Sequence, residues 1–143
     1  MRIDRHEMMM KMAEVTALRG TCDRLQVGCV IARDGRSIST GYNGNVAGVR
    51  HCKHTDETPC STAMHAEGNA LIYAARNGVS TSDAYLYTTH MPCYDCSRLI
   101  VNAGITKVFY KIPYRKTEGV ELLRQVGVEV FRLNEEYSLI QVR

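Results

Sequence analysis

Two short stretches of the sequence carry residue types that bind and use a metal ion. His65 and Glu67 are separated by one alanine, and Cys93 and Cys96 by two residues directly after a proline. Zinc prefers imidazole and thiolate ligands, and three protein ligands leave a fourth position for water, as in catalytic zinc sites. The sequence therefore predicts a catalytic zinc site with ligands His65, Cys93 and Cys96, and with Glu67 as an acid and base beside it.

The spacing of these residues constrains the elements that hold them. A helix turns about 100° per residue, so the two cysteines lie roughly 60° apart on one face. Pro92 suits the first turn of that helix, where its missing N–H costs nothing. The histidine and the glutamate diverge by about 200° within a regular helix. Both reach one water only if a helix begins there, with Ser61 and Thr62 as candidate caps. We expect two helix N-termini to converge on one zinc ion.

Length and composition limit the class of protein. The 143 residues, 45% hydrophobic and 23% charged, are typical of one soluble globular domain spanning 1–143. The net charge of +3 favours anionic small molecules over a nucleic-acid partner. The N-terminus lacks the apolar core of a signal peptide, and no apolar run is long enough for a membrane span. We expect a cytoplasmic protein whose six cysteines serve as thiols and metal ligands.

The hydrophobic pattern predicts alternating elements after an initial helix and hairpin. Helices are expected over 4–19, 62–77, 93–103 and 117–126, and strands over 26–32, 36–41, 84–89, 106–110 and 128–133. Asp34 and Gly35 mark the hairpin turn, and residues 134–143 give no clear pattern. Cys29 is expected to be a buried thiol and His6 a surface residue. The fold class is α/β, a three-layer α/β/α sandwich with a five-stranded mixed sheet.

The motifs together resemble one enzyme family. Gly-Tyr-Asn-Gly at 41–44, His-Ala-Glu-Gly-Asn-Ala at 65–70 and the Pro-Cys-x-x-Cys stretch at 92–96 are similar to those of deoxycytidylate (dCMP) deaminases, including small phage-type members, within the cytidine deaminase-like superfamily. The resemblance implies zinc-dependent hydrolysis of dCMP to dUMP and ammonia, with Glu67 as the proton shuttle. The product would feed dTMP synthesis.

The same resemblance suggests how the substrate is held. It implies that Asn43 binds the deoxyribose 3′-hydroxyl and that the backbone of Ala66 and Thr88 orients the base. The phosphate needs a cation, for which Arg115 is the first candidate and Arg24 the second, although either could be a solvated surface charge. The predicted substrate-binding residues are Arg24, Asn43, Ala66, Thr88, Tyr114 and Arg115.

Regulation and a second metal are also implied by the resemblance. Family members are commonly hexamers, activated by dCTP and inhibited by dTTP. Here the triphosphate with its Mg²⁺ would meet the long loop at Gly44, Asn45, Arg50, His51 and Lys53, unless that loop is only a wall of the active site. Some phage members hold a second, structural zinc, for which Cys22, Cys52 and His90 are the candidates, with His51, His54 and Cys60 as alternatives.

Two classes of protein remain as alternatives: a tRNA-acting adenosine deaminase or another cytidine deaminase-like enzyme, and a noncatalytic zinc-binding module. A tRNA-acting adenosine deaminase would favour a cluster of basic residues for RNA, and the sequence has none. A noncatalytic zinc-binding module would fill all four metal positions and would have no use for a carboxylate such as Glu67 that does not bind the metal.

Overall fold

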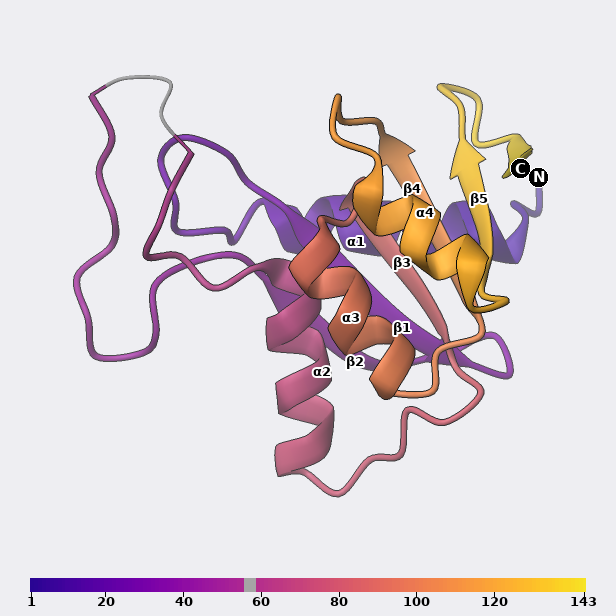
Figure 1. The fold of residues 1–143 in the computed structure, drawn as a ribbon, viewed down its shortest axis with the longest axis horizontal. Coiled ribbons are helices and arrows are strands. Elements are labelled where there is room, and N and C mark those ends of the chain that lie inside the picture. The colour runs from indigo at the N-terminus through magenta and orange to yellow at the C-terminus, as the bar shows by residue number, and fades with distance from the viewer. Residues whose placement is uncertain (56–58) are drawn as a thin grey trace.

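The computed structural model describes residues 1–55 and 59–143, and within them six strands form one mixed sheet with helices on both faces (Figure 1). The strand order across the sheet is β2-β1-β3-β4-β5-β6. The strands are β1 (Gly28–Arg33), β2 (Arg36–Tyr42), β3 (Tyr85–His90), β4 (Lys107–Ile112), β5 (Glu129–Leu133) and β6 (Leu139–Val142). The helices are α1 (Arg5–Ala17), α2 (Ala66–Arg76), α3 (Tyr94–Asn102) and α4 (Glu118–Gln125).

Helix α1 lies alone on one face of the sheet, and α2, α3 and α4 cover the other (Figure 1). Asp4 begins α1 by accepting a hydrogen bond from the His6 N–H at 2.8 Å. One stripe of α1, which includes Met9, Met10 and Ala13, is buried against the sheet. The predicted α/β/α sandwich is therefore confirmed.

The strands that carry site residues are placed by two kinds of pairing. β1 and β2 form an antiparallel hairpin, and its turn puts Asp34 at φ 55° and Gly35 at φ 73°, both in the left-handed region. β3, β4 and β5 are parallel, so their carboxyl ends meet at one edge. In open α/β sheets that edge is where ligands bind.

The prediction of five strands was one short. Residues 139–142 add β6, which pairs antiparallel with β5 from Val130↔Val142 to Leu133↔Leu139. This strand is short and largely exposed, so it carries little apolar alternation that sequence reading could detect. It forms a hairpin with β5 across residues 134–138, through backbone pairing that the residue types of β6 do not announce.

Two smaller expectations had different outcomes. Cys29 is fully buried in β1, as predicted. His6 is not simply a surface residue: its ring stacks on Phe109 with centroids 4.7 Å apart, and its Nδ1 lies 2.7 Å from the Tyr87 hydroxyl. No helix in residues 1–55 or 59–143 combines the length and the apolar character that a membrane span requires.

Candidate active site

Two helix N-termini meet above the sheet. His65 is the N-cap of α2, with an extended backbone (φ −77°, ψ 152°), and Cys93 is the N-cap of α3. The Cys93 thiol also caps its helix, since Sγ accepts a hydrogen bond from the Cys96 N–H at 3.4 Å. Ser61 and Thr62, the candidate caps, lie upstream of the helix start, and α2 has no side-chain cap.

The three predicted ligands converge at these helix ends. His65 Nδ1 lies 3.4 Å from Cys93 Sγ and 3.3 Å from Cys96 Sγ. All three donor atoms lie within 4.8 Å of one another. A zinc tetrahedron with ordinary Zn–N and Zn–S bonds places nitrogen and sulfur roughly 3.6 Å apart. The group therefore fits a zinc ion with small adjustments of the side chains.

The electrostatic environment of the two thiols favours the binding of a cation. The hydrogen bond with Cys96, helped by His65, lowers the pKa of the Cys93 thiol to about 4, so Cys93 is a thiolate at neutral pH. The same thiolate raises the pKa of Cys96. The hydrogen bond to Cys93 raises the pKa of His65. A negative sulfur and an imidazole in contact form the donor set that zinc prefers.

Glu67 lies in the first turn of α2 and is only 4% exposed. Burial raises the pKa of its carboxyl to about 7, although its own backbone N–H and His65 oppose the shift. A carboxyl with a pKa near the working pH both accepts and returns a proton readily. This environment suits an acid and base and has no role in a purely structural metal site.

Strand β2 fixes the start of α2. The Ser39 hydroxyl donates to the Ala70 carbonyl at 2.7 Å, and the Asn69 amide donates to the Tyr42 carbonyl at 2.8 Å. A Cβ on Gly41 would lie 2.5 Å from the Ala66 carbonyl oxygen, so only glycine allows this close packing. Sequence reading missed these contacts, because they join segments about 30 residues apart.

Comparison with known proteins agrees with this geometry. Residues 3–112 match a family model described as the cytidine and deoxycytidylate deaminase zinc-binding region. The chain belongs to this family. It is 37% identical to ComE operon protein 2 of Bacillus subtilis over 99% of this chain and 78% of that one. It is 32% identical to the deoxycytidylate deaminase of enterobacteria phage T2, over 87% of this chain and 89% of the phage protein.

A solved structure gives the same result. The dCMP deaminase of cyanophage S-TIM5, in complex with dCMP and dUMP, matches the deaminase fold with a TM-score of 0.85 and 36% identity. The match covers 92% of this chain and 98% of the cyanophage chain.

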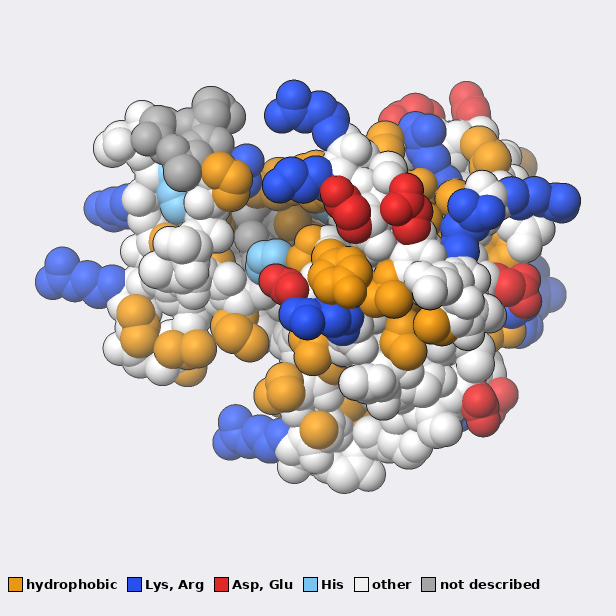
Figure 2. Space-filling model, viewed as in Figure 1, with side chains coloured by type: hydrophobic (Ala, Val, Ile, Leu, Met, Phe, Trp, Pro, Cys, Tyr) orange, Lys and Arg blue, Asp and Glu red, His pale blue; other side chains and the backbone are white. Residues whose placement is uncertain are grey.

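A pocket of about 510 Å³ in the deaminase is lined by residues 20–26 and His90, the residue that ends β3. Arg24 lies on this wall, and the ring of Tyr114, on the loop after β4, lies 6.0 Å from that of His90, centroid to centroid. Burial raises the pKa of the Tyr114 phenol, Arg24 lowers it, and Glu67 and Cys93 raise it, so Tyr114 is close to both the pocket and the site. Arg115 is exposed on the same loop. Figure 2 shows a hollow between the long loop and the helices, with Lys and Arg side chains along its upper rim.

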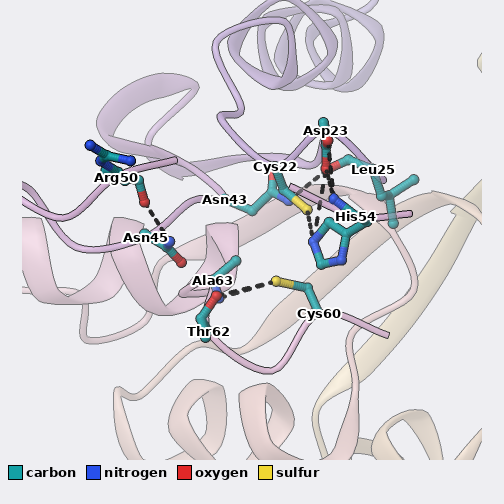
Figure 3. Close-up of polar contacts among 10 residues, drawn as sticks. All are labelled: Cys22, Asp23, Leu25, Asn43, Asn45, Arg50, His54, Cys60, Thr62 and Ala63. Carbon is teal, nitrogen blue, oxygen red and sulfur yellow. Dashed lines mark hydrogen bonds and ion pairs between the residues drawn. The ribbon is translucent and has the colours of Figure 1, made fainter. Parts of the chain in front are cut away.

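The other predicted substrate residues are buried. Ala66 and Thr88 are both 0% exposed, one in the first turn of α2 and one in β3. The Asn43 amide is engaged in the fold: Oδ1 accepts from the Val27 N–H at 2.8 Å, and Nδ2 donates to the Leu25 carbonyl at 2.7 Å (Figure 3). It retains one N–H and one lone pair for a ligand.

A second group of possible metal ligands joins the long loop to the segment between α1 and β1. It consists of Cys22, Cys52, His54 and Cys60, whose donor atoms all lie within 4.8 Å of one another. Cys22 Sγ is 3.4 Å from His54 Nε2, and the Asp23 carboxylate accepts the His54 backbone N–H (Figure 3). His54 and Cys60, two of the alternatives, therefore join Cys22 and Cys52 in this group in place of His90, the first candidate. The His90 ring instead bonds to Thr89.

The candidate effector loop is joined to the site at its base. Gly44 and Met64 exchange two backbone hydrogen bonds of 3.0 and 2.8 Å, directly before His65. The Asn45 amide donates to the Arg50 carbonyl at 2.7 Å and closes the loop on itself. Residues 48–51 and Lys53 line a concavity of about 810 Å³, so Arg50, His51 and Lys53 are brought together.

Proposed function

We propose that the chain deaminates dCMP to dUMP and releases ammonia. The observation that carries this proposal is Glu67, a buried carboxyl with a pKa of about 7 beside a three-ligand zinc group. The dCMP and dUMP bound in the cyanophage relative support the choice of substrate.

The residues of this chain have distinct roles in the reaction. His65, Cys93 and Cys96 would hold the zinc ion, which would act as a Lewis acid and make a water nucleophilic near neutral pH. Glu67 takes a proton from the attacking water and delivers it to N3 of cytosine, which activates C4. Glu67 then helps to protonate the amino group, so that ammonia leaves and the uracil carbonyl remains.

The substrate is held by residues around the pocket. The backbone at Ala66 and Thr88 orients the base, and Asn43 contacts the 3′-hydroxyl with the bonding capacity that it retains. Arg24 and Tyr114 line the path to the phosphate, with Arg115 at its rim. Arg24 becomes the stronger phosphate candidate of the two arginines, because it lines the pocket itself.

Ammonia release from dCMP, cytidine and a tRNA anticodon stem tests the proposal. We expect turnover of dCMP well above that of cytidine, and none of the RNA. Glu67→Gln should keep its zinc and lose turnover by about two to four orders of magnitude, the usual contribution of acid–base catalysis. Turnover of the RNA with no activity on dCMP would contradict this proposal and would indicate a tRNA-acting adenosine deaminase.

A structural zinc bound by Cys22, Cys52, His54 and Cys60 is a second part of the proposal. Four protein ligands and no position for water are typical of a structural site. We expect two zinc ions per chain by elemental analysis, and one after His54→Ala. Cys29→Ala is the matched control, because it removes a buried thiol outside both groups and should keep both ions. One zinc in the wild-type protein would contradict a second site.

Regulation by nucleoside triphosphates is the third part. The Gly44–Met64 backbone pairing links the effector loop to His65, so a ligand that shifts the loop would shift a metal ligand. A triphosphate with Mg²⁺ would meet Arg50, His51 and Lys53 in the concavity, with Gly44 and Asn45 at the base of the loop. We expect sigmoidal dCMP kinetics that become hyperbolic with dCTP, and inhibition by dTTP that dCTP relieves. Hyperbolic kinetics indifferent to both triphosphates would refute this regulation.

The regulated form is proposed to be a hexamer. Several large apolar side chains on the outer helices are half exposed, as expected of an oligomer interface. They are Ile72 (61%), Tyr73 (58%) and Leu99 (51%). Light scattering after size exclusion should give six times the chain mass of 16.1 kDa. A monomer at working concentration would refute the hexamer and leave the catalytic proposal unaffected.

A further inference from the structure

His90 is a polar residue of the pocket to which the chemistry above assigns no role. It is the last residue of β3, at the carboxyl edge of the parallel strands, and it pairs with Ile112 of β4. It lines the 510 Å³ pocket together with Arg24. Its ring lies 6.0 Å from the Tyr114 ring, centroid to centroid. The imidazole therefore shares the pocket wall with Arg24 and lies near Tyr114, the two side chains expected nearest the phosphate.

A chain of hydrogen bonds fixes which ring nitrogen carries the proton. The Gly28 backbone N–H donates to the Thr89 hydroxyl oxygen at 3.2 Å, and that oxygen lies 2.8 Å from His90 Nδ1. Thr89 is 4% exposed, and within residues 1–55 and 59–143 its hydroxyl has no other acceptor. A buried O–H without an acceptor is costly, so Thr89 donates to Nδ1.

The proton of a neutral imidazole then resides on Nε2, because Nδ1 is the acceptor. Burial lowers the pKa of His90, which keeps the ring neutral at neutral pH. The backbone of His90 is also fixed, because the Thr88 hydroxyl donates a hydrogen bond to the His90 carbonyl at 3.2 Å. The result is a single N–H donor whose orientation is set by β1 and β3 before any ligand binds.

We propose that the Nε2–H of His90 donates a hydrogen bond to the phosphate of the bound nucleotide, beside Arg24. This inference rests on the proposed function, and it adds a residue that selects nucleotide over nucleoside. The neighbouring Arg24 favours an anion in this pocket, whereas the base is expected at the zinc group and the sugar at Asn43. Thr89 is then a positioning residue, which acts only through the tautomer of His90.

Kinetics of three His90 variants test this contact. His90→Phe keeps a ring against Tyr114 and removes the N–H. Because a hydrogen bond to a charged group contributes strongly to binding, its loss should raise KM for dCMP about ten- to a hundredfold. KM for deoxycytidine should change less than about twofold, because that substrate has no phosphate. His90→Gln places an N–H near the Nε2 position and should recover part of the loss, whereas His90→Asn reaches only the Nδ1 position and should not.

Two measurements separate this inference from the catalytic proposal. Wild-type turnover of dCMP tests the function alone. Calorimetric binding of dUMP, compared between wild type and His90→Phe, tests the phosphate contact without any turnover. Nitrogen-15 NMR of the histidine ring should show the Nε2–H tautomer in the wild type and a mixture of tautomers in Thr89→Val. Equal losses for dCMP and deoxycytidine, unchanged dUMP affinity in His90→Phe, or an Nδ1–H tautomer in the wild type would overturn the proposal.

Discussion

Gly119 controls how closely α4 approaches a zinc ligand, and Gly119→Ala tests how much displacement the metal site tolerates. The glycine lies in the first turn of α4, and its Cα faces the backbone that enters α3. An added Cβ would lie 2.5 Å from the Pro92 carbonyl oxygen and 2.7 Å from the carbonyl carbon and oxygen of Cys93. The obstacles are backbone atoms, so no side-chain rotation can relieve them.

The expected size of the effect follows from these distances. Ordinary contact begins at 3.4 Å, so α4 or the Pro92–Cys93 backbone must move by about 0.9 Å. Metal sites tolerate about 0.2 Å in their bond lengths, and Cys93 is the residue displaced. Overpacking costs about 1–3 kcal/mol, and alanine returns up to about 1 kcal/mol of helix propensity. We expect a net loss of about 1–2 kcal/mol and a melting temperature lower by about 3–8 °C.

Urea denaturation and competition for zinc with a chelator measure the two consequences. Gly119→Ala should unfold at lower urea and release zinc at a lower chelator concentration. Gly68→Ala is the matched control, because its Cβ would meet only Leu99 Cδ1 at 3.8 Å, an ordinary contact. This control should be as stable as the wild type or up to about 1 kcal/mol more stable. Wild-type stability and zinc retention in Gly119→Ala would refute the reasoning.

Three further predictions concern other contacts. Burial lowers the pKa of His6 from 6.5 in the folded state, so the free energy of unfolding should fall as the pH drops below 6.5. Urea denaturation across that pH range should show a smaller fall in His6→Phe, which has no ring nitrogen to protonate. Ser39→Ala removes the hydrogen bond to the Ala70 carbonyl of α2 and should lower the free energy of unfolding by about 0.5–1.5 kcal/mol in the same assay. An unchanged urea midpoint would show that this hydrogen bond does not stabilise the fold. The Tyr137 hydroxyl donates to Glu14 at 2.6 Å beside the β6 turn, so Tyr137→Phe should speed hydrogen exchange of β6 amides and leave α3 amides unchanged.

The parts of the molecule that were predictable from sequence are those set by neighbouring residues. The metal group follows from residues within two helix starts, because capping geometry and ligand spacing are local. The turn at Asp34 and Gly35 and the burial of Cys29 are also local outcomes, the second from a run of apolar residues in β1. The turn and the buried thiol needed no knowledge of which segments meet in space, whereas the zinc prediction assumed that two helix starts converge, as those of His65 and Cys93 do.

The second group of ligands, for which sequence reading offered His54 and Cys60 only as alternatives, depends on how distant segments meet. His54 and Cys60 reach Cys22 only because the long loop folds back over residues 20–26, a path that no local pattern specifies. β6 was missed for a different reason: it pairs with the neighbouring β5 in a hairpin, but its largely exposed residues carry no apolar alternation. The spacing Cys52-x-His54 with Cys60 after five residues was a readable signal of metal binding, but its fourth ligand lies 30 residues away in the chain.

The end of β2 connects the separate parts of the site. Tyr42 accepts a hydrogen bond from Asn69 and holds α2, Asn43 holds residues 25–27 of the pocket wall, and Gly44 pairs with Met64 beside His65. Three consecutive residues thus position a catalytic helix, a substrate wall and a metal ligand. A shift of this segment by an effector must change all three together, and coupling energies of about 1–3 kcal/mol are typical of such devices. The proposed substrate pocket and the candidate effector loop therefore share one strand end, which gives the proposed regulation a physical route.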